Sequence, residues 1–149
     1  LEATKTGGSS ADDAEFIGAG ANDGSGSLAK FRTAVGVSSG ALSSNDYPAW
    51  AWIEGYAAAA NLTGTSESGW YMPSIAELCK LYQAKTDVNK ALSKITGATQ
   101  LSAIYWSSSQ NGSSTYSRCA WDVDFGSGDL NGARGKNAPI DSVCAVRAF

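Results

Sequence analysis

Three aspartates and two glycines lie close together near the C-terminus, and an oxygen-rich loop of this kind can bind calcium. They are Asp122, Asp124, Gly126, Gly128 and Asp129. An EF-hand loop needs oxygen ligands at its first, third and fifth positions, glycine at its sixth and glutamate at its twelfth. Counted from Asp122, the last three of these positions hold Gly126, Ser127 and Ala133. The spacing therefore argues against an EF-hand, and we expect neither a metal nor a cofactor.

The same stretch alternates between apolar and acidic residues, as a half-buried strand does. Asp122 and Asp124 are predicted to face solvent, and Gly-Ser-Gly at 126–128 is predicted to turn the chain. The apolar members, which we expect to point into the core, are Trp121, Val123 and Phe125.

Histidine is absent from the chain, which removes the most common proton shuttle and metal ligand. Ser-His-Asp catalysis, Cys-His catalysis and His-ligated zinc are therefore excluded. The three cysteines have no CxxC spacing. Cys79 lies in a helical apolar stripe and is predicted to be a small buried hydrophobe. Cys119 and Cys144 could form a disulfide if their strands are neighbours, although an odd number of cysteines argues against a disulfide framework.

The composition predicts one folded domain that spans residues 1–149. Hydrophobic residues make up 43% of the chain, and five of them are tryptophan. The net charge of −3 argues against nucleic-acid binding. No apolar run approaches the length that crosses a membrane, so we expect no membrane insertion. Residues 1–14 are small and polar and are expected to form a loose lead-in.

Helical signals dominate the middle of the chain. A short strand is expected at 15–20 and a weakly amphipathic segment at 28–37. The first clear helix is predicted to start at Asp46 as N-cap, with Pro48 in its first turn, and to stop by Gly64. Ser74 and Glu77 form a capping box that starts a second helix. A third helix is predicted over 87–97.

After Gly97 the pattern changes to short strands, predicted at 103–109, 119–125 and 142–149. The Gly-, Ser- and Asn-rich segments 110–117 and 126–141 are expected to be loops. Helices followed by strands predict an α+β fold. Trp52 is expected to be partly exposed, whereas the tryptophans expected to build the core are Trp50, Trp70, Trp106 and Trp121.

Four phrases together carry a family resemblance that covers about residues 45–149. They are GWYMPSIAEL at 69–78, YWSSS at 105–109, AWDVDFGSGDL at 120–130 and VRAF at 146–149. In this order and spacing the chain resembles a bacterial and viral branch of the C-type lectin-like fold, related to the formylglycine-generating-enzyme type. The resemblance implies helices in the N-terminal two-thirds and short antiparallel strands in the C-terminal third.

Within that branch, residues from about 105 to 149 are similar to the variable region of diversity-generating retroelement target proteins. Adenine-rich asparagine codons in such regions become randomised, which can give Asp, Gly, Ser, Ala, Arg or Asn, but not Lys. Lys136 is therefore expected to be a fixed loop residue. The other fixed places match Trp121, Val123, Phe125, Gly128 and the final four residues, with Trp106 also part of the scaffold. The matching variable places are Asp122, Asp124, Gly126, Ser127, Asp129, Asn131, Gly132, Ala133 and Arg134.

The resemblance implies a binding module, and no enzyme, that displays a diversified surface on a rigid lectin-like scaffold. Its partner would be a protein or a glycan on a cell surface, and its own location would be extracellular, on a cell surface or on a virion. Tyr116 and Arg118 are candidate anchors because both residue types are enriched at binding hot spots, although both could be ordinary exposed loop residues. Together with the nine variable places, the candidate ligand contacts include five residues of the loop before the strand at 119–125, namely Asn111, Ser113, Thr115, Tyr116 and Arg118.

Two alternatives remain open from the sequence. A fixed-specificity surface adhesin domain would have the same scaffold without diversification. A formylglycine-generating-type oxidase would need a pair of reactive cysteines, and Cys119 and Cys144 are the candidates. Their spacing does not reproduce the enzyme motif, and no cationic cluster in the sequence is placed to activate either thiol.

Overall fold

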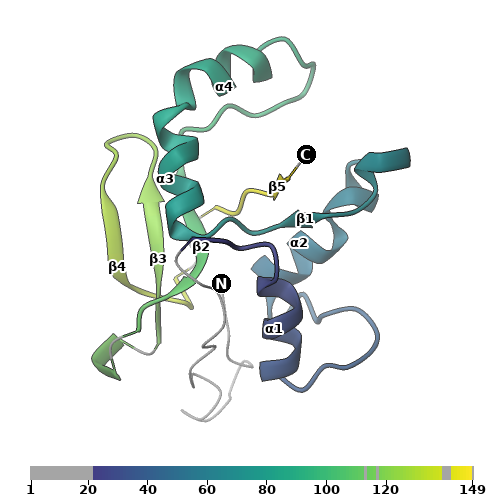
Figure 1. Ribbon diagram of the computed structural model, residues 1–149, viewed down its shortest axis with the longest axis vertical. Coiled ribbons are helices and arrows are strands. Elements are labelled where there is room, and N and C mark those ends of the chain that lie inside the picture. Colours follow the sequence, from purple (N-terminus) through teal and green to yellow (C-terminus); the bar gives the residue numbers. More distant parts are fainter. Residues whose placement is uncertain (1–21, 113, 117, 139–141, 149) are drawn as a thin grey trace.

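The protein has an α+β fold in which the helices come first and most of the strands follow (Figure 1). The computed structural model describes residues 22–112, 114–116, 118–138 and 142–148. The expected lead-in at 1–14 and the expected strand at 15–20 lie outside these residues. The described helices are α1 (Ser27–Ala34), α2 (Pro48–Ala59), α3 (Ile75–Gln83) and α4 (Lys85–Leu92), with 3-10 turns η1 (Gly64–Ser66) and η2 (Ser114–Tyr116).

The described strands form two antiparallel sheets. One sheet has the order β2-β3-β4, and the other pairs β1 with β5. The bounds are β1 (Trp70–Tyr71), β2 (Ile104–Gln110), β3 (Cys119–Asp124), β4 (Leu130–Gly135) and β5 (Val146–Arg147). The first two strand predictions after Gly97 are confirmed to within one residue. Of the strand predicted at 142–149, only β5 and an isolated bridge between Ser142 and Tyr105 are present among the described residues.

Two strands were not expected from the sequence. β1 is only two residues long and owes its strand geometry to its pairing with β5. β4 lies within the segment 126–141 that was predicted to be a loop, and this prediction is wrong. Its sequence, LNGARG, has neither alternation nor β-branched residues, so only the pairing with β3 defines it.

The start of α3 follows the local sequence signal. Ser74 and Glu77 make the predicted capping box, with Ser74 N donating to Glu77 Oε2 at 2.8 Å. The Glu77 carboxylate also accepts from Gly24 N at 2.9 Å and from Tyr71 Oη at 2.8 Å. Leu78 is fully buried, and Cys79 is partly buried beside it, so the apolar stripe is confirmed. One carboxylate thus joins the helix start to β1 and to the segment before α1.

The start of α2 differs from the prediction. Pro48 is the first helical residue, as expected, but the N-cap position is Tyr47 and no side chain caps it. The expectation of an Asp46 N-cap is therefore wrong by one residue. Tyr47 is buried and its ring packs edge-on against Phe31, with centroids 5.2 Å apart. Core packing rather than a side-chain cap positions this end of the helix.

The core has two parts, one on each face of the three-stranded sheet. Tyr105 and Val123 lie opposite each other on β2 and β3 and pack with α3. Trp106 and Ala120 belong to the second part, with α1 and α2. In Figure 1 α3 lies beside the strands of this sheet, whereas α1 and α2 lie to the right of it. The sheet is consequently buried on both faces where β2 and β3 meet.

Of the tryptophans expected in the core, Trp50 and Trp106 are buried. Trp70 and Trp121 are only half-buried, which corrects the prediction for these two. Trp52 is 44% exposed, as expected.

Candidate ligand-binding surface

The hairpin of β3 and β4 carries most of the candidate contact residues. Its turn is closed by Asp124 N, which donates to Asp129 O at 2.9 Å, and by Gly128 N, which donates to Asp124 O at 2.7 Å. Asp124 Oδ1 also accepts from Gly126 N at 2.6 Å, and Ser127 Oγ donates to Asp129 Oδ2 at 2.8 Å. The carboxylates of the turn therefore accept hydrogen bonds within the turn itself. Gly126, Ser127 and Asp129 are exposed.

Asp122 is not displayed to solvent, and the expectation that it would be is wrong. Its side chain is 1% exposed, and Arg134 Nε donates to its Oδ2 at 2.7 Å. The predicted alternation itself holds, because Val123 and Phe125 are buried on the other face. The second face was expected to be solvated, but it is covered as well. Burial raises the pKa of the Asp122 carboxyl, and the hydrogen bond and charge of Arg134 oppose this rise.

A bulge in β4 creates this pair. Asp122 lies opposite Asn131, but Ala120 lies opposite Arg134 instead of Ala133. Two residues of β4 therefore face the single residue Trp121 between these pairs. Without the extra residue, Arg134 would lie opposite Cys119 and point to the other face of the sheet. The bulge thus turns Arg134 toward Asp122.

Gly132 and Ala133 form the bulge and have different surroundings. A Cβ atom at Gly132 would lie 2.7 Å from the ring of Trp121, so the indole covers this position closely. Ala133 is exposed, and its N–H donates to Asn131 Oδ1 at 2.9 Å. Of these candidate positions, only Ala133 presents its side chain openly, whereas Gly132 and Asn131 are half-buried.

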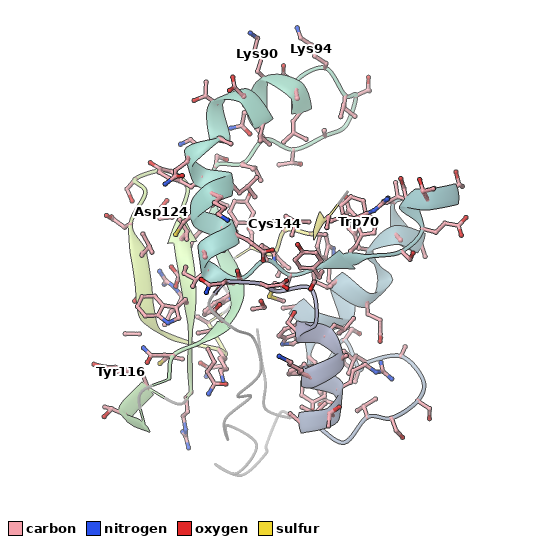
Figure 2. The ribbon with its side chains drawn as sticks, in the orientation of Figure 1. Trp70, Lys90, Lys94, Tyr116, Asp124 and Cys144 are labelled. Atoms are coloured by element: carbon pink, nitrogen blue, oxygen red, sulfur yellow. The ribbon has the colours of Figure 1, made fainter. Side chains whose placement is uncertain are left out.

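The loop before β3 lies at the other end of the hairpin. Thr115, Tyr116 and Arg118 are exposed, with Tyr116 at 43%. Asn111 is half-buried and its Nδ2 donates to Gly132 O at 2.6 Å, which links the end of β2 to β4. Ser113 lies outside the described residues. Figure 2 shows Tyr116 and Asp124 at opposite ends of the hairpin, which for six-residue strands means a separation of about 20 Å.

The structure therefore sorts the candidate positions by accessibility. Asp122, Arg134 and Asn111 make the structural bonds described above, and Asp124 is partly buried. Leu130 on β4 is 53% exposed and was not among the candidates. We use the name display surface for the exposed candidates, which are Thr115, Tyr116, Arg118, Gly126, Ser127, Asp129 and Ala133.

The cysteines do not pair in the structure. The condition for a Cys119–Cys144 disulfide, neighbouring strands, is not met, because Cys119 lies in β3, which pairs with β2 and β4, whereas Cys144 lies between β5 and Ser142, the residue that bridges to Tyr105 of β2. Cys119 Sγ lies 3.3 Å from Ala133 O as a weak donor. Burial raises the pKa of the Cys144 thiol to about 12. A thiol with so high a pKa is a poor nucleophile at neutral pH.

Comparisons of the chain with protein-family models, with curated proteins and with solved structures found no match. Among the described residues, no group of three or more acidic or cysteine side chains is arranged to hold a metal ion. None of the helices in the described segments has the length and apolar character needed to span a bilayer.

Proposed function

We propose that the protein is a ligand-binding module whose display surface contacts a protein or a glycan on a cell surface. The observation that carries this proposal is the contrast between the display surface and the framework beneath it. The display residues are exposed, whereas Trp106, Val123 and Phe125 are at most 1% exposed. Substitution at exposed positions usually changes stability by less than about 0.5 kcal/mol. Such a surface can change its chemistry while the fold persists.

The backbone under the hairpin part of the display surface, from Gly126 to Ala133, is well held. The ladder of β2, β3 and β4, the Asn111 bond to Gly132 O and the bonds within the turn each fix a part of it. A surface that is already ordered loses less conformational entropy when a ligand binds. This rigidity supports recognition by a preformed surface.

We infer that the scaffold is C-type lectin-like and that the hairpin belongs to a diversified region of the retroelement type. The order of helices and antiparallel strands is consistent with the fold that the sequence resemblance implies. Asp122 and Arg134 are both matched to variable places, and they satisfy each other's charge. Diversification at these two places would therefore be restricted to residue pairs that remain compatible when buried.

The properties of the cysteine thiols also support a binding function over catalysis. An oxidase of the formylglycine-generating type would need two reactive cysteines, and Cys144 is a partly buried residue whose thiol has a raised pKa. The proposed ligand lies on a cell surface. The binding proposal therefore implies that this protein is extracellular, on a cell surface or on a virion.

A fixed-specificity adhesin would share the scaffold but not the diversification. The genomic neighbourhood distinguishes the two. A nearby reverse transcriptase, together with a near-identical repeat of the DNA for the last part of the chain that differs only at adenines, would support diversification. If the reverse transcriptase and the repeat are absent, the fixed-specificity adhesin is the better description.

The binding proposal itself is tested with two display libraries on the same scaffold. One library randomises Ser127, Asp129, Ala133, Thr115 and Tyr116, and the matched control randomises five exposed positions on and after α4, namely Lys90, Ala91, Ser93, Lys94 and Ile95. Both are panned against the same set of cell-surface proteins and glycans. We expect specific binders mainly from the first library. Equal yields from both, or unfolding of most members of the first, would contradict the proposal.

A further inference from the structure

The outer side of α2 is apolar and uncharged, which is unusual for a helix at the surface of a protein. Its one charged residue, Glu54, is engaged with α1 and the following loop. It pairs with Arg32 and accepts from Leu42 N at 2.7 Å. The exposed residues of the helix and its C-cap are Pro48, Trp52, Gly55, Ala58, Ala59 and Ala60.

Three aromatic rings continue this side of the molecule from α2 to β1. Trp52 and Tyr56 have centroids 5.1 Å apart with planes at 49°, and Tyr56 and Trp70 have centroids 4.8 Å apart with planes at 63°. Trp52 is exposed and the other two are half-exposed. The indole N–H of Trp70 donates to Ser66 O at 2.7 Å, which fixes that ring. We call Trp52, Tyr56 and Trp70 the aromatic strip.

The aromatic strip lies away from the display surface. Figure 2 shows Trp70 on the opposite side of the molecule from Asp124 and Tyr116. A ligand at the strip would therefore leave the display surface accessible.

We propose that the aromatic strip binds the apolar face of a neutral sugar ring. The C–H groups on one face of a pyranose pack against the electron-rich faces of Trp and Tyr. The absence of charge along the exposed side of α2 favours a neutral ligand. Residues 61–68 border the strip in sequence and offer polar groups for the sugar hydroxyls. Their exposed members include Asn61, Thr63, Thr65, Ser68 and one charged residue, Glu67, whose carboxylate accepts from Gly64 N at 3.0 Å. This site goes beyond the proposed function and does not depend on it.

The size of the strip favours a small ligand over a second protein chain. A 12-residue helix is about 18 Å long and about 10 Å wide, so its outer side offers on the order of 200 Å². A stable protein interface needs about 800 Å² from each partner. The rings also contact one another, so they leave no enclosed gap of the kind that surrounds a quaternary ammonium group. A row of rings that are tilted against one another, with Trp52 the most exposed of them, matches the face of a single sugar ring better than either alternative.

The experiment is a glycan array of neutral oligosaccharides probed with the folded protein, followed by titration of the best binder with tryptophan fluorescence as readout. We expect Trp52→Ala to weaken binding about tenfold or more and Trp52→Phe to retain part of it. Tyr116→Ala, an exposed aromatic residue on the display surface, is the matched control and should change the affinity less than twofold. Thermal melts check that each variant is folded, which the exposure of Trp52 leads us to expect.

Several results would overturn the site. No binding of the wild type to any neutral glycan at millimolar concentration would do so, as would a loss in Tyr116→Ala that equals the loss in Trp52→Ala. Tighter binding of tetramethylammonium than of any sugar would assign the rings to a cation instead. A concentration-dependent dimer in analytical ultracentrifugation that Trp52→Ala abolishes would assign the face to a second copy. None of these results bears on the libraries that test the display surface.

Discussion

Arg134 on β4 donates its Nε–H to Asp122 Oδ2 on β3 at 2.7 Å, and the carboxylate that accepts this bond is buried. The two residues come together only because the bulge at Gly132 and Ala133 turns Arg134 to the face that Asp122 occupies. A pair inside the hairpin therefore joins Asp122, which the alternating pattern assigned to solvent, to Arg134, which was expected among the variable places.

Breaking this pair should destabilise the protein. Arg134→Ala leaves a buried carboxylate without its partner, and we expect a loss of about 2–4 kcal/mol in the free energy of unfolding. Asp122→Ala leaves an arginine that reaches solvent, so its loss should be smaller. The double variant should lose less than the sum of the single ones. Urea denaturation of the four proteins measures this, with Asp129→Ala as a surface control that changes stability by less than about 1 kcal/mol. Additive losses would show that the pair has no coupling energy.

The Asp122 carboxyl should also make the free energy of unfolding depend on pH. Its folded-state pKa lies above the usual value because it is buried. This contribution to stability is fully present below the unfolded pKa, about 3.8, and is lost as the pH rises through the folded-state pKa. The stability of the wild type relative to Asp122→Asn should therefore be greatest in acid and decline toward neutral pH. Denaturation midpoints measured from about pH 3 to about pH 8 test this. A difference that grows with pH would mean that Arg134 outweighs burial.

Tyr71 should make the fold sensitive to alkali. Burial and the hydrogen bond from Tyr71 Oη to Glu77 raise the pKa of this tyrosine to about 12. Its contribution to stability is present below about pH 10, the value for an unfolded chain, and is lost as the pH rises through about 12. Tyr71→Phe should be about 1 kcal/mol less stable than the wild type at pH 8 because a hydrogen bond is lost. The difference in stability between the wild type and Tyr71→Phe should disappear between pH 10 and 12. Denaturation at each pH measures this difference, and a difference that stays constant would contradict the raised pKa of Tyr71.

Cys144 should be the thiol slowest to react in the native state. Its burial raises its pKa to about 12, so roughly one thiol in 10⁴ is ionised at pH 8. Iodoacetamide labelling followed by peptide mass spectrometry should find Cys144 unmodified until denaturant is added. Cys144→Ala should leave the rate of native labelling unchanged. Rapid modification of Cys144 in the native protein would reopen its candidacy as a reactive cysteine.

Gly128 should not tolerate a side chain. Its φ is +89°, and a Cβ there would lie 2.6 Å from Tyr82 Oη. Both the left-handed backbone and the close ring oppose an L-residue, so Gly128→Ala should cost about 1–3 kcal/mol. Gly112→Ala is the control, because a Cβ at Gly112 meets nothing within 4 Å. Thermal and chemical denaturation compare the two. Equal stabilities would mean that Tyr82 moves aside and the turn relaxes.

The local features of this fold were predictable from the sequence. The capping box at Ser74 depends on residues three positions apart, and the alternation that buries Val123 and Phe125 depends on residues two apart. Both signals lie within one element, so no knowledge of the rest of the chain was needed. The exposure of Tyr116 and of the turn at Gly126 and Ser127 followed from the same local reasoning.

Tertiary structure alone decided which residues on the two strands of the hairpin are accessible. The strand β4 exists through its pairing with β3, and one extra residue in it selects the face on which Arg134 lies. The burial of Asp122 depends on that choice and on Trp106, which comes from a strand 16 residues earlier in the chain and lies opposite Asp122. Side-chain alternation shows that two faces differ, but not whether the second face is solvated, because its covering residues come from distant parts of the sequence. For this reason the sequence determined the framework of the hairpin, and the packing of distant segments determined which of its residues can meet a ligand.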